Sequence, residues 1–407
     1  MPEAVVVAAA RTPIGRAFKG SLVDLRPDDL TATIVRAALA RVPELDPATL
    51  DDVYVGCAEP SGEQGSNLAR VVAVLAGLDG VPGATVNRFC ASSVQTTRMA
   101  FHAIAAGEGH AFVSAGVEMV SRYRDFTGAG QGEDGVQNPV FAGAAERSAR
   151  LAAEGAPWSD PRDDGALPDI YVAMGQTAEN VAQLHGVTRR EQDEWAVESQ
   201  QRAEKAQANG VLAREITPVT RPDGTVVDRD DSPRPGTTLE GISGLRTVFR
   251  ENGTVTAGNA CPLSDGAAAL VVMSDTRARE LGITPLARVV STAVSGLSPE
   301  IMGMGPVEAT RKALALAGMT MDDIDLVELN EAFAAQVVPC ADQLGIDRDR
   351  LNVHGGAIAL GHPFGMTGAR ITTTLLNALQ AHDRQLGLET MCVGGGQGMS
   401  IVYERLS

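Results

Sequence analysis

The stretch at residues 85–100, TVNRFCASSVQTTRMA, decides how the rest of the sequence is interpreted. It passes from a short β-like run through Cys90 into a segment with the composition of a helix. At a helix N-terminus, the aligned peptide dipoles and the free amides of the first turn favour the thiolate form of a cysteine. This position predicts a lowered pKa and a nucleophilic role for Cys90. The competing interpretation is a small buried hydrophobic residue, the more common fate of a single cysteine.

Short apolar runs alternate with helical patterns on both sides of this stretch. The alternation occupies about the first 120 residues and resumes after Asn259, which is typical of α/β layers around a buried sheet. Three pairs of segments from the two ends of the chain resemble each other: 53–56 and 326–329, 87–90 and 359–362, and 110–116 and 389–395. The sequence thus predicts an internal repeat, in which two similar halves bring Cys90, His362 and Cys392 to one seam.

The composition changes between these halves. From about residue 121 to residue 250 the chain is rich in Gly, Asp, Pro, Gln and Arg, with one long helical pattern near residues 189–209. This composition predicts an inserted, mostly surface-lying subdomain. The predicted domains are residues 1–121 together with 251–277, the insertion at 122–250, and residues 278–407.

The whole chain has the composition of a globular protein. With 407 residues, 44% of them hydrophobic, it can bury a large core in two or three domains. The formal net charge of −17 argues against nucleic acid as a partner, because phosphates attract clustered Lys and Arg. The five cysteines lack CxxC spacing, which favours free thiols in a reducing compartment. No apolar stretch approaches the roughly 20 residues that span a bilayer, so we expect a cytoplasmic protein without a membrane partner.

A glycine-rich segment at residues 352–368 contains two histidines, His354 and His362. Glycine lets the backbone approach a ligand closely and adopt a positive φ. A histidine on such a loop can remove a thiol proton and later stabilise charge on an acyl oxygen. An incidental histidine in a glycine-rich turn explains the segment equally well. The GxxxxGK pattern of a nucleotide-binding loop does not occur in it.

Two further segments place polar groups beside apolar runs. Residues 392–398, CVGGGQG, set Cys392 against a glycine turn, whose exposed amides can form an oxyanion hole. An ordinary hairpin turn is the alternative there. Asn330 follows the apolar run 324–329, where its amide can position a water or a carbonyl group, or can only cap the next helix.

Taken together, these segments resemble the thiolase family. The matching motifs stand in thiolase order and cover nearly the whole chain: NRFCASS at 87–93, MGQTAEN at 174–180, GTVTAGNA at 253–260, NEAFA at 330–334, the loop 355–368 with GHP, and CVGGG at 392–396. The resemblance implies an α/β fold of two similar halves in a five-layered αβαβα architecture, with a loop domain inserted in the first half. It also implies a homo-oligomer, a dimer or a tetramer, of which we expect the tetramer.

The resemblance further implies ping-pong acyl transfer between acyl-CoA and acetyl-CoA. Cys90, activated by His362, attacks an acyl-CoA or a 3-ketoacyl-CoA and carries the acyl group. Cys392 acts as a base on the α-carbon of acetyl-CoA in synthesis and as an acid in thiolysis. A water held by Asn330 joins His362 at one substrate oxygen, while the backbone amides of Cys90 and Gly394 face the oxygen of the covalent intermediate. Coenzyme A thioesters are the substrates, and neither a metal nor a cofactor is expected.

Substrate contacts are implied in the same way. Arg234, in the insertion, is expected to meet the phosphates of CoA, which an acidic protein must receive on a locally basic surface. The expected lining around the pantetheine and acyl groups consists of Met174, Phe249, Ala260, Cys261, Met302 and Phe333.

Three positions depart from the pattern of biosynthetic acetoacetyl-CoA thiolases. His354, Ala173 and Cys261 stand where that pattern usually has Asn, His and Ser. The departures leave the catalytic residues intact, so they affect the expected chain length of the acyl group and not the reaction class. A degradative 3-ketoacyl-CoA thiolase for longer chains is therefore the alternative within the family.

Two other functions compete with this interpretation. A β-ketoacyl synthase pairs one cysteine with two histidines, or with one histidine and an asparagine, whereas Cys392 in its glycine turn and Asn330 in NEAF favour a thiolase. A non-catalytic CoA-binding or lipid-binding protein on the same scaffold is expected to have lost Cys90, His362 or Cys392. All three residues are present.

Overall fold

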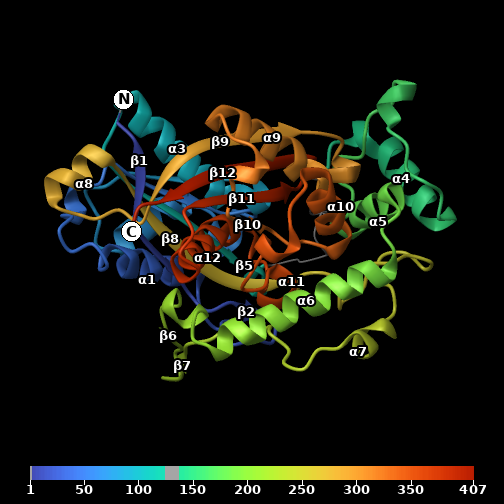
Figure 1. The fold of residues 1–407 in the computed structure, drawn as a ribbon, viewed down its shortest axis with the longest axis horizontal. Helices are drawn as coiled ribbons and strands as arrows, with labels where there is room; N and C mark the ends of the chain where they lie inside the picture. The colour runs from blue at the N-terminus through green and yellow to red at the C-terminus, as the bar shows by residue number, and fades with distance from the viewer. Residues whose placement is uncertain (1, 124–136) are drawn as a thin grey trace.

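The computed structural model describes residues 2–123 and 137–407, which form an α/β structure around one long mixed sheet (Figure 1). The strand order across the sheet is β4-β3-β5-β8-β1-β9-β12-β11-β10, and the short β2 pairs with β8. The strands are β1 (Ala4–Arg11), β2 (Gly15–Arg16), β3 (Asp52–Gly56), β4 (Gly83–Val86), β5 (Ala111–Met119), β8 (Ser264–Ser274), β9 (Ala287–Gly296), β10 (Leu326–Leu329), β11 (Leu386–Val393) and β12 (Gln397–Arg405).

The sheet consists of two halves that meet at β1. This strand pairs with β8 along nearly its whole length, but with β9 only at Val5 and Val6. In the first half β1, β8 and β5 are antiparallel neighbours and β5, β3 and β4 are parallel; in the second half β9, β12 and β11 are antiparallel and β11 and β10 are parallel. Leu351 forms a parallel bridge to Val327 of β10, as β4 does to β3. The halves share one topology, which confirms the predicted repeat.

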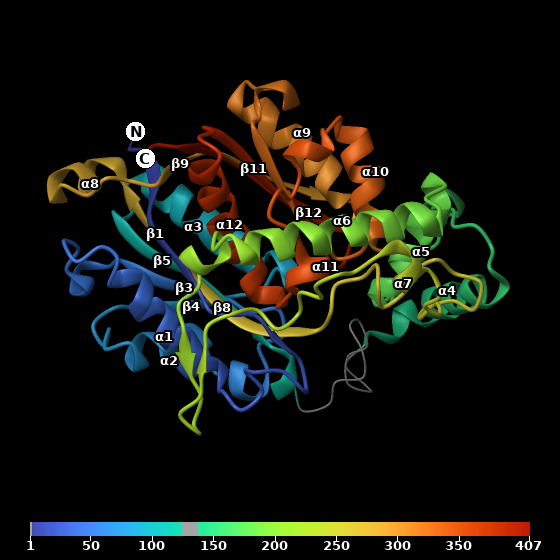
Figure 2. The same ribbon diagram turned by 60° about the horizontal axis from the view of Figure 1, so that its bottom comes forward.

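Helices alternate with the two halves of the sheet in five layers (Figures 1 and 2). The helices of the layers are α1 (Pro27–Leu39), α2 (Leu68–Leu75), α3 (Ser92–Ala106), α9 (Gly305–Ala317), α10 (Ala334–Leu344) and α12 (Thr367–Ala381), and α8 (Asp275–Leu281) joins β8 to β9. α1 and α2 pack on the first half, α3 and α12 lie between the halves, and α9 and α10 pack on the second half. This order is the predicted αβαβα architecture. Within the described ranges, no helix has the length and apolar composition needed to cross a membrane.

The apolar runs of the sequence explain the central strands, and small residues explain the middle layer. β1 and β8 are buried at every position, as expected for strands that are covered on both faces. In the middle layer, Gly368 of α12 lies against Val94 of α3. A Cβ atom at Gly368 would collide with the Val94 backbone, so glycine permits this close approach. This close approach brings the N-terminal ends of α3 and α12 together. Cys90 and His362 precede these two ends in the sequence.

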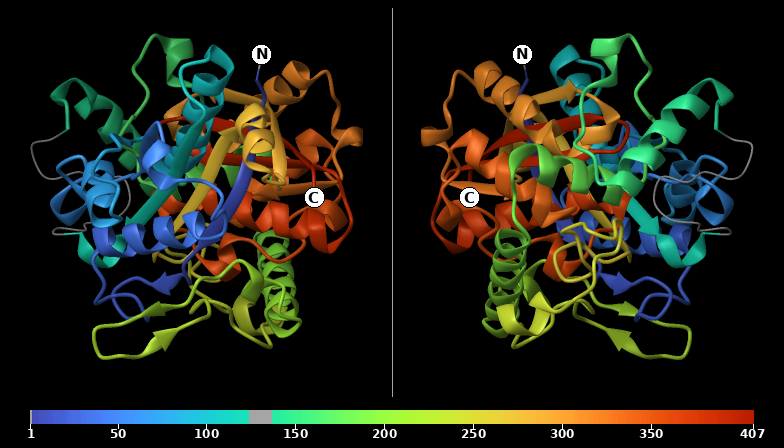
Figure 3. Two further views of the ribbon diagram at one scale, coloured as in Figure 1. Left: turned by 90° about the vertical axis from the view of Figure 1, so that its left-hand side faces the viewer. Right: turned by 90° about the vertical axis from the view of Figure 1, so that its right-hand side faces the viewer.

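The described part of the insertion lies between β5 and β8 in the sequence (green to yellow in Figure 3), and in Figure 1 it occupies the bottom and the right-hand end of the molecule. Its elements are α4 (Ala142–Glu154), α5 (Met174–His185), α6 (Arg189–Ala208), the hairpin β6 (Val219–Thr220) and β7 (Val226–Val227), and α7 (Leu239–Ser243). α6 is the long predicted helix, and it begins with a capping box between Thr188 and Glu191. The expectation of a mostly surface-lying subdomain is wrong for α6, because Trp195 and Ala203 are buried and the helix packs against α10 and α11 (Ala357–Leu360).

The middle of the protein holds buried ionisable residues, among them Glu389 of β11. Burial raises the pKa of Glu389 to about 8, so the folded protein keeps this carboxyl group protonated at neutral pH. The unfolded chain ionises it near pH 4.3, its pKa in model peptides being about 4.3. Because the folded state binds the additional proton, the group contributes stability that is fully present below the unfolded pKa and is lost as the pH rises through about 8.

Glu389→Gln is therefore expected to flatten the pH dependence of the free energy of unfolding. A glutamine has nearly the same shape and stays neutral, so the variant should melt at a higher temperature than the wild type at about pH 9 and differ less from it at about pH 5. Differential scanning calorimetry across this range tests the expectation. An unchanged pH profile in the variant would show that Glu389 is ionised in the folded protein.

Candidate active site

Cys90 lies in a single 3₁₀ turn, Phe89–Ala91, between β4 and α3. Phe89 has a φ of 44°, a left-handed conformation that is uncommon for a bulky residue. This conformation costs energy, and such strained residues cluster at functional sites. Hydrogen bonds hold the turn: the Phe89 amide donates to Asn87 Oδ1 at 2.8 Å, and the Arg88 amide donates to Ser92 Oγ at 2.9 Å. The sharp turn presents Cys90 at the seam between the two halves.

The pKa of Cys90 differs from the prediction. Burial raises it to about 12, although the backbone amides of Gly394 and of Cys90 itself hydrogen-bond to the sulfur and favour the thiolate. The nearby Glu118 raises it further. The expectation of a lowered pKa is wrong, because α3 begins only at Ser92 and the desolvation of the thiol outweighs the amides. Cys90 therefore needs a base to become a nucleophile.

The alkylation of Cys90 by iodoacetamide is expected to accelerate as the pH rises. Because the thiol has a pKa of about 12, the thiolate fraction grows throughout the range in which the protein can be handled. The rate should show no plateau between about pH 6 and about pH 10. Mass spectrometry of the peptide that contains Cys90 measures the rate. A plateau near neutral pH would instead indicate a resting thiolate paired with an imidazolium.

His362 follows α11 and Gly361, whose φ of 112° favours glycine. Its backbone amide donates to Ser264 Oγ at 3.2 Å. Its Nδ1 lies 2.6 Å from Thr367 Oγ, and the Thr367 hydroxyl donates to the Pro363 carbonyl at 2.8 Å. Since the only hydroxyl proton of Thr367 is used on Pro363, Nδ1 of His362 must donate to Thr367. Nε2 of the ring then carries no proton and can accept one.

The charge state of His362 agrees with this tautomer. Burial, and next the charge of Arg370, lower its pKa to about 3. The imidazole is therefore neutral in the resting protein, which makes it available as a base. Asn330 lies beside it, with Nδ2 at 3.3 Å from His362 Nε2. Asn330 Oδ1 is buried and has no hydrogen-bond partner among the described residues, which leaves an acceptor for a water at this position.

Cys392 is the second-last residue of β11, where it pairs with Gly398 of β12, and only Val393 separates it from the predicted glycine turn. Gly395 and Gly396 have φ values of 74° and 77°, so this turn requires glycine. Burial raises the pKa of the Cys392 thiol well above its usual value. The neighbouring thiols of Cys90, Cys340 and Cys261 raise it further. The structure thus brings Cys90 and Cys392, from opposite halves, into electrostatic range of each other and of Gly394.

Several of the expected lining residues form one wall. The rings of Phe249 and Phe333 meet edge to face with centroids 6.1 Å apart, and Ala260 forms a bridge with Phe333. The Cys261 amide donates to the Ala332 carbonyl at 3.1 Å, and the Cys261 thiol is within electrostatic range of Cys90. Met174 and Met302 belong to the same apolar cluster on the second half. This wall connects to Cys90 and Cys392 through Cys261, which lies within electrostatic range of both.

Arg234 and His354 lie elsewhere. Arg234 is exposed, its amide donates to Gln200 Oε1 of α6 at 2.8 Å, and its charged neighbour is Arg16. No contact recorded for the described residues joins it to the wall. His354 is buried and faces His382, with the two Nε2 atoms 3.3 Å apart. Burial, His382 and Arg214 lower the pKa of His354 to about 4, so it is a neutral structural residue.

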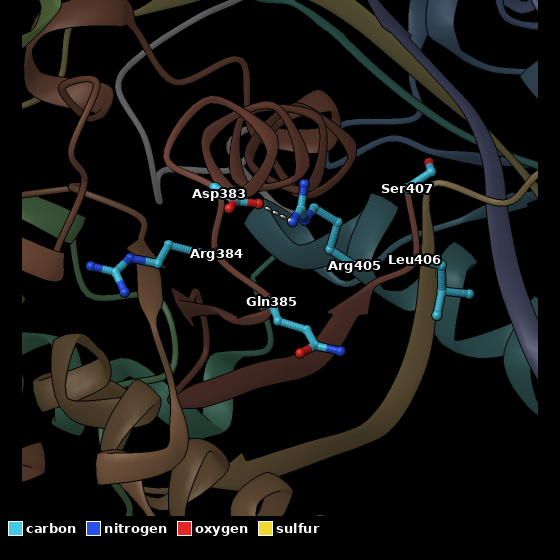
Figure 4. Close-up of a pocket in the computed structure, with 6 residues that line it drawn as sticks. All are labelled: Asp383, Arg384, Gln385, Arg405, Leu406 and Ser407. Carbon is cyan, nitrogen blue, oxygen red and sulfur yellow. Dashed lines mark hydrogen bonds and ion pairs between the residues drawn. The ribbon is translucent and has the colours of Figure 1, made fainter.

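The surface hollow in Figure 4 is a different feature. It is lined by Asp383, Arg384, Gln385, Arg405, Leu406 and Ser407, and the figure shows the ion pair of Asp383 with Arg405, which spans 2.7 Å. None of the predicted site residues lines it. Among the described residues, no group of three or more His, Cys, Asp or Glu is arranged to hold a metal ion.

Sequence reasoning missed several residues that shape the site. Phe89 sets the turn of Cys90, while Thr367 and Ser264 fix His362. Glu118 and Glu331, both buried, hold the surrounding loops. Phe89 and Glu331 stand next to Cys90 and Asn330 in the sequence, and Thr367 lies in the glycine-rich segment, which were the available signals. Ser264 and Glu118 act through hydrogen bonds to a distant segment, which no local pattern reveals.

Comparison with known proteins gives consistent matches over the whole chain. Residues 4–276 match the family model described as the thiolase N-terminal domain, and residues 283–405 match the thiolase C-terminal domain. The chain is 44% identical to the 3-ketoacyl-CoA thiolase of Photobacterium profundum, with 100% of both chains covered. It is 42% identical to the 3-ketoacyl-CoA thiolase of Bacillus subtilis, over 99% of this chain and 100% of that one. The crystal structure of the Bacillus anthracis acetyl-CoA acetyltransferase superposes with a TM-score of 0.86 at 36% identity, covering 100% and 99% of the two chains.

Proposed function

Since the chain belongs to the thiolase family and is an acyltransferase acting on acyl-CoA and CoA, we propose that it works through an acyl group carried on Cys90. The reaction is reversible and of ping-pong type. In one direction two acetyl-CoA give acetoacetyl-CoA and CoA, and in the other a 3-ketoacyl-CoA and CoA give acetyl-CoA and a shortened acyl-CoA. The observation that carries the proposal is the unprotonated Nε2 of a neutral His362, at the seam that also holds Cys90 and Cys392.

In the synthetic direction, the first step transfers an acetyl group to Cys90. His362 Nε2 takes the thiol proton as the sulfur attacks the thioester carbonyl. The amides of Cys90 and Gly394, which hydrogen-bond to the sulfur in the resting state, are placed to stabilise the oxygen of the tetrahedral intermediate. The intermediate collapses, the bond to the CoA sulfur breaks, and the proton on His362 passes to the departing CoA thiolate.

The second step forms the carbon–carbon bond. His362, neutral again after the first step, takes up the thiol proton of Cys392 and becomes an imidazolium. Cys392, now a thiolate, removes a proton from the α-carbon of a second acetyl-CoA, and the resulting carbanion attacks the acyl carbon on Cys90. The sulfur of Cys90 leaves and regains a proton from the imidazolium of His362. His362 and a water held by Asn330 stabilise the enolate oxygen in the meantime. In thiolysis the steps run backwards, and Cys392 protonates the departing acetyl-CoA enolate.

The substrate preference that we favour is thiolysis of 3-ketoacyl-CoA. The relatives at 44% and 42% identity are named 3-ketoacyl-CoA thiolases, whereas the solved acetyl-CoA acetyltransferase is 36% identical. The departures at Ala173, Cys261 and His354 point the same way. Synthesis or cleavage of acetoacetyl-CoA is the second candidate, supported by the similarity to that acetyltransferase.

Thiolytic cleavage of 3-ketoacyl-CoAs from about four to about sixteen carbons tests both candidates, because each added methylene changes kcat/KM by a measurable factor in a fitting pocket. We expect longer chains to give the higher kcat/KM. A clear preference for the four-carbon substrate would select the second candidate. No cleavage at any length would overturn the proposal in favour of a protein that only binds CoA.

We also propose the substrate contacts, the cellular compartment and the oligomeric state of the enzyme. The apolar wall of Met174, Phe249, Ala260, Cys261, Met302 and Phe333 contacts pantetheine and the acyl group, and Arg234 receives a CoA phosphate. The enzyme uses neither a metal nor a cofactor, acts in the cytoplasm, and assembles as a homo-oligomer, a tetramer in preference to a dimer. The free cysteines of the described chain support a reducing compartment. The division at residues 121, 250 and 277 stays a prediction.

A further inference from the structure

Two buried glutamates lie at the two ends of the loop that carries His362. Glu118 is the second-last residue of β5 in the first half, and Glu331 follows Asn330 in the second half. Both glutamates are fully buried, and neither forms an ion pair with any described residue. A buried carboxylate without a cation is costly unless several donors reach it. The donors that meet these two carboxylates show which segments they fix.

Glu331 fixes the loop before His362. Its Oε1 accepts from Trp195 Nε1 at 3.1 Å and from Asn352 Nδ2 at 2.9 Å. Its Oε2 accepts from the Ile358 amide at 3.1 Å and from Ser199 Oγ at 2.7 Å.

Ser199 extends this contact toward the loop. Its hydroxyl oxygen accepts from the Gly356 amide at 3.1 Å while its proton goes to Glu331. A Cβ atom at Gly356 would collide with the Glu331 carboxylate, so glycine is what lets the backbone come this close. One carboxylate thus ties α6, Asn352 and the start of α11 together, four residues before His362.

Glu118 fixes the loop after His362. Its Oε2 accepts from the Gly365 amide at 2.9 Å and from the Ala58 amide at 2.8 Å. Its Oε1 accepts from Tyr123 Oη at 2.7 Å and from Gln64 Nε2 at 2.8 Å. Gly365 stands three residues after His362, so this carboxylate joins the histidine loop to the segment that follows β3 in the opposite half of the sheet.

We propose that Glu118 and Glu331 are positioning residues, which hold the His362 loop from the two halves and so fix His362 Nε2 relative to Cys90. The inference rests on the proposed function, in which these two groups exchange a proton. The loop between the two anchors contains the short α11 and the start of a 3₁₀ turn at Phe364–Met366, and its glycines give it little stiffness of its own. Glu331 is also the chain neighbour of Asn330, so one anchor sets both groups that meet at His362 Nε2.

The test is Glu118→Gln and Glu331→Gln, assayed for thiolysis with kcat and KM measured separately. Glutamine keeps the shape of glutamate but replaces one acceptor oxygen with an NH₂ group. This group donates hydrogen bonds and cannot accept them from the N–H and O–H groups that face it, so the loop is displaced. A displacement of about 1 Å at a reacting group can cost about 10²-fold in rate, so we expect kcat to fall by about 10- to 100-fold with KM within about threefold of the wild type. Substrate binding stays intact because neither glutamate lines the apolar wall.

Glu179→Gln is the matched control. Glu179 is also buried and accepts from the Thr254 and Val255 amides, at 2.9 and 2.9 Å, but it touches no residue of the His362 loop. The control should keep kcat close to the wild-type value. If Glu118→Gln and Glu331→Gln lower kcat no more than the control does, or if KM changes instead of kcat, the positioning role is wrong.

Ser199→Ala is the milder variant, used in case either glutamine variant fails to fold. It removes one donor from Glu331 and the acceptor of the Gly356 amide, and it leaves every charge in place. We expect a several-fold loss of kcat at unchanged KM, and an unchanged kcat would overturn the role of Glu331. Acylation of wild-type Cys90 by acetyl-CoA, measured alongside, separates the two ideas. Absence of acylation contradicts the proposed function, whereas normal acylation with unaffected variants contradicts only the positioning role.

Discussion

Replacing Cys90 with alanine is expected to abolish thiolysis, with kcat falling on the order of 10⁴- to 10⁶-fold, as when the nucleophile of a covalent mechanism is removed. The turn Phe89–Ala91 and the start of α3 do not depend on the sulfur, so the variant should fold and still bind acyl-CoA. The two measurements are the steady-state rate of thiolysis by the variant and its melting temperature, which should equal that of the wild type.

The control for this variant is Cys340→Ala. Cys340 is another buried thiol in the same region, on α10, and its thiol donates to the Gly303 carbonyl at 3.2 Å. It should retain activity. Substantial turnover by Cys90→Ala, or equal losses in both variants, would show that the acyl group is not carried on Cys90.

Cys392→Ala is expected to separate the two halves of the reaction. Thiolysis and synthesis require a proton at the α-carbon to move, and loss of the group that moves it should lower both rates by about 10²- to 10⁴-fold. Exchange of CoA between acetyl-CoA and free labelled CoA needs only Cys90 and His362. That exchange should be retained in the variant.

The two assays on one protein decide the role of Cys392. Full loss of the exchange together with thiolysis would assign Cys392 to acyl transfer itself, or show that the glycine turn and the Gly394 amide have moved. Retained thiolysis would mean that another group acts on the α-carbon.

Much of the fold was predictable because it repeats. The similarity of residues 53–56 to 326–329 placed β3 and β10 at matching positions, and the segments before Cys90 and His362 precede the two central helices. Apolar runs without alternation indicated buried strands, as β1 and β8 are. These features depend on local composition and order, which a single sequence contains in full.

The rest depends on contacts that form only in the folded chain. The helix N-terminus suggested an acidic thiol at Cys90, but burial by residues from the other half raises its pKa, and only the folded structure reveals that burial. The tautomer of His362 follows from two hydrogen bonds of Thr367. α6 has a polar composition, yet one of its faces is buried, where Trp195 and Ser199 donate hydrogen bonds to Glu331.

The central claim is that Cys90 carries the acyl group, and the most direct measurement is to find that group. The protein is incubated with acetyl-CoA, quenched in acid, digested and analysed by mass spectrometry. The account predicts one acetyl group on the peptide that contains Cys90, and its loss when free CoA is added before the quench. An unmodified Cys90, or an acetyl group on Cys392 or Cys261 instead, would contradict the account.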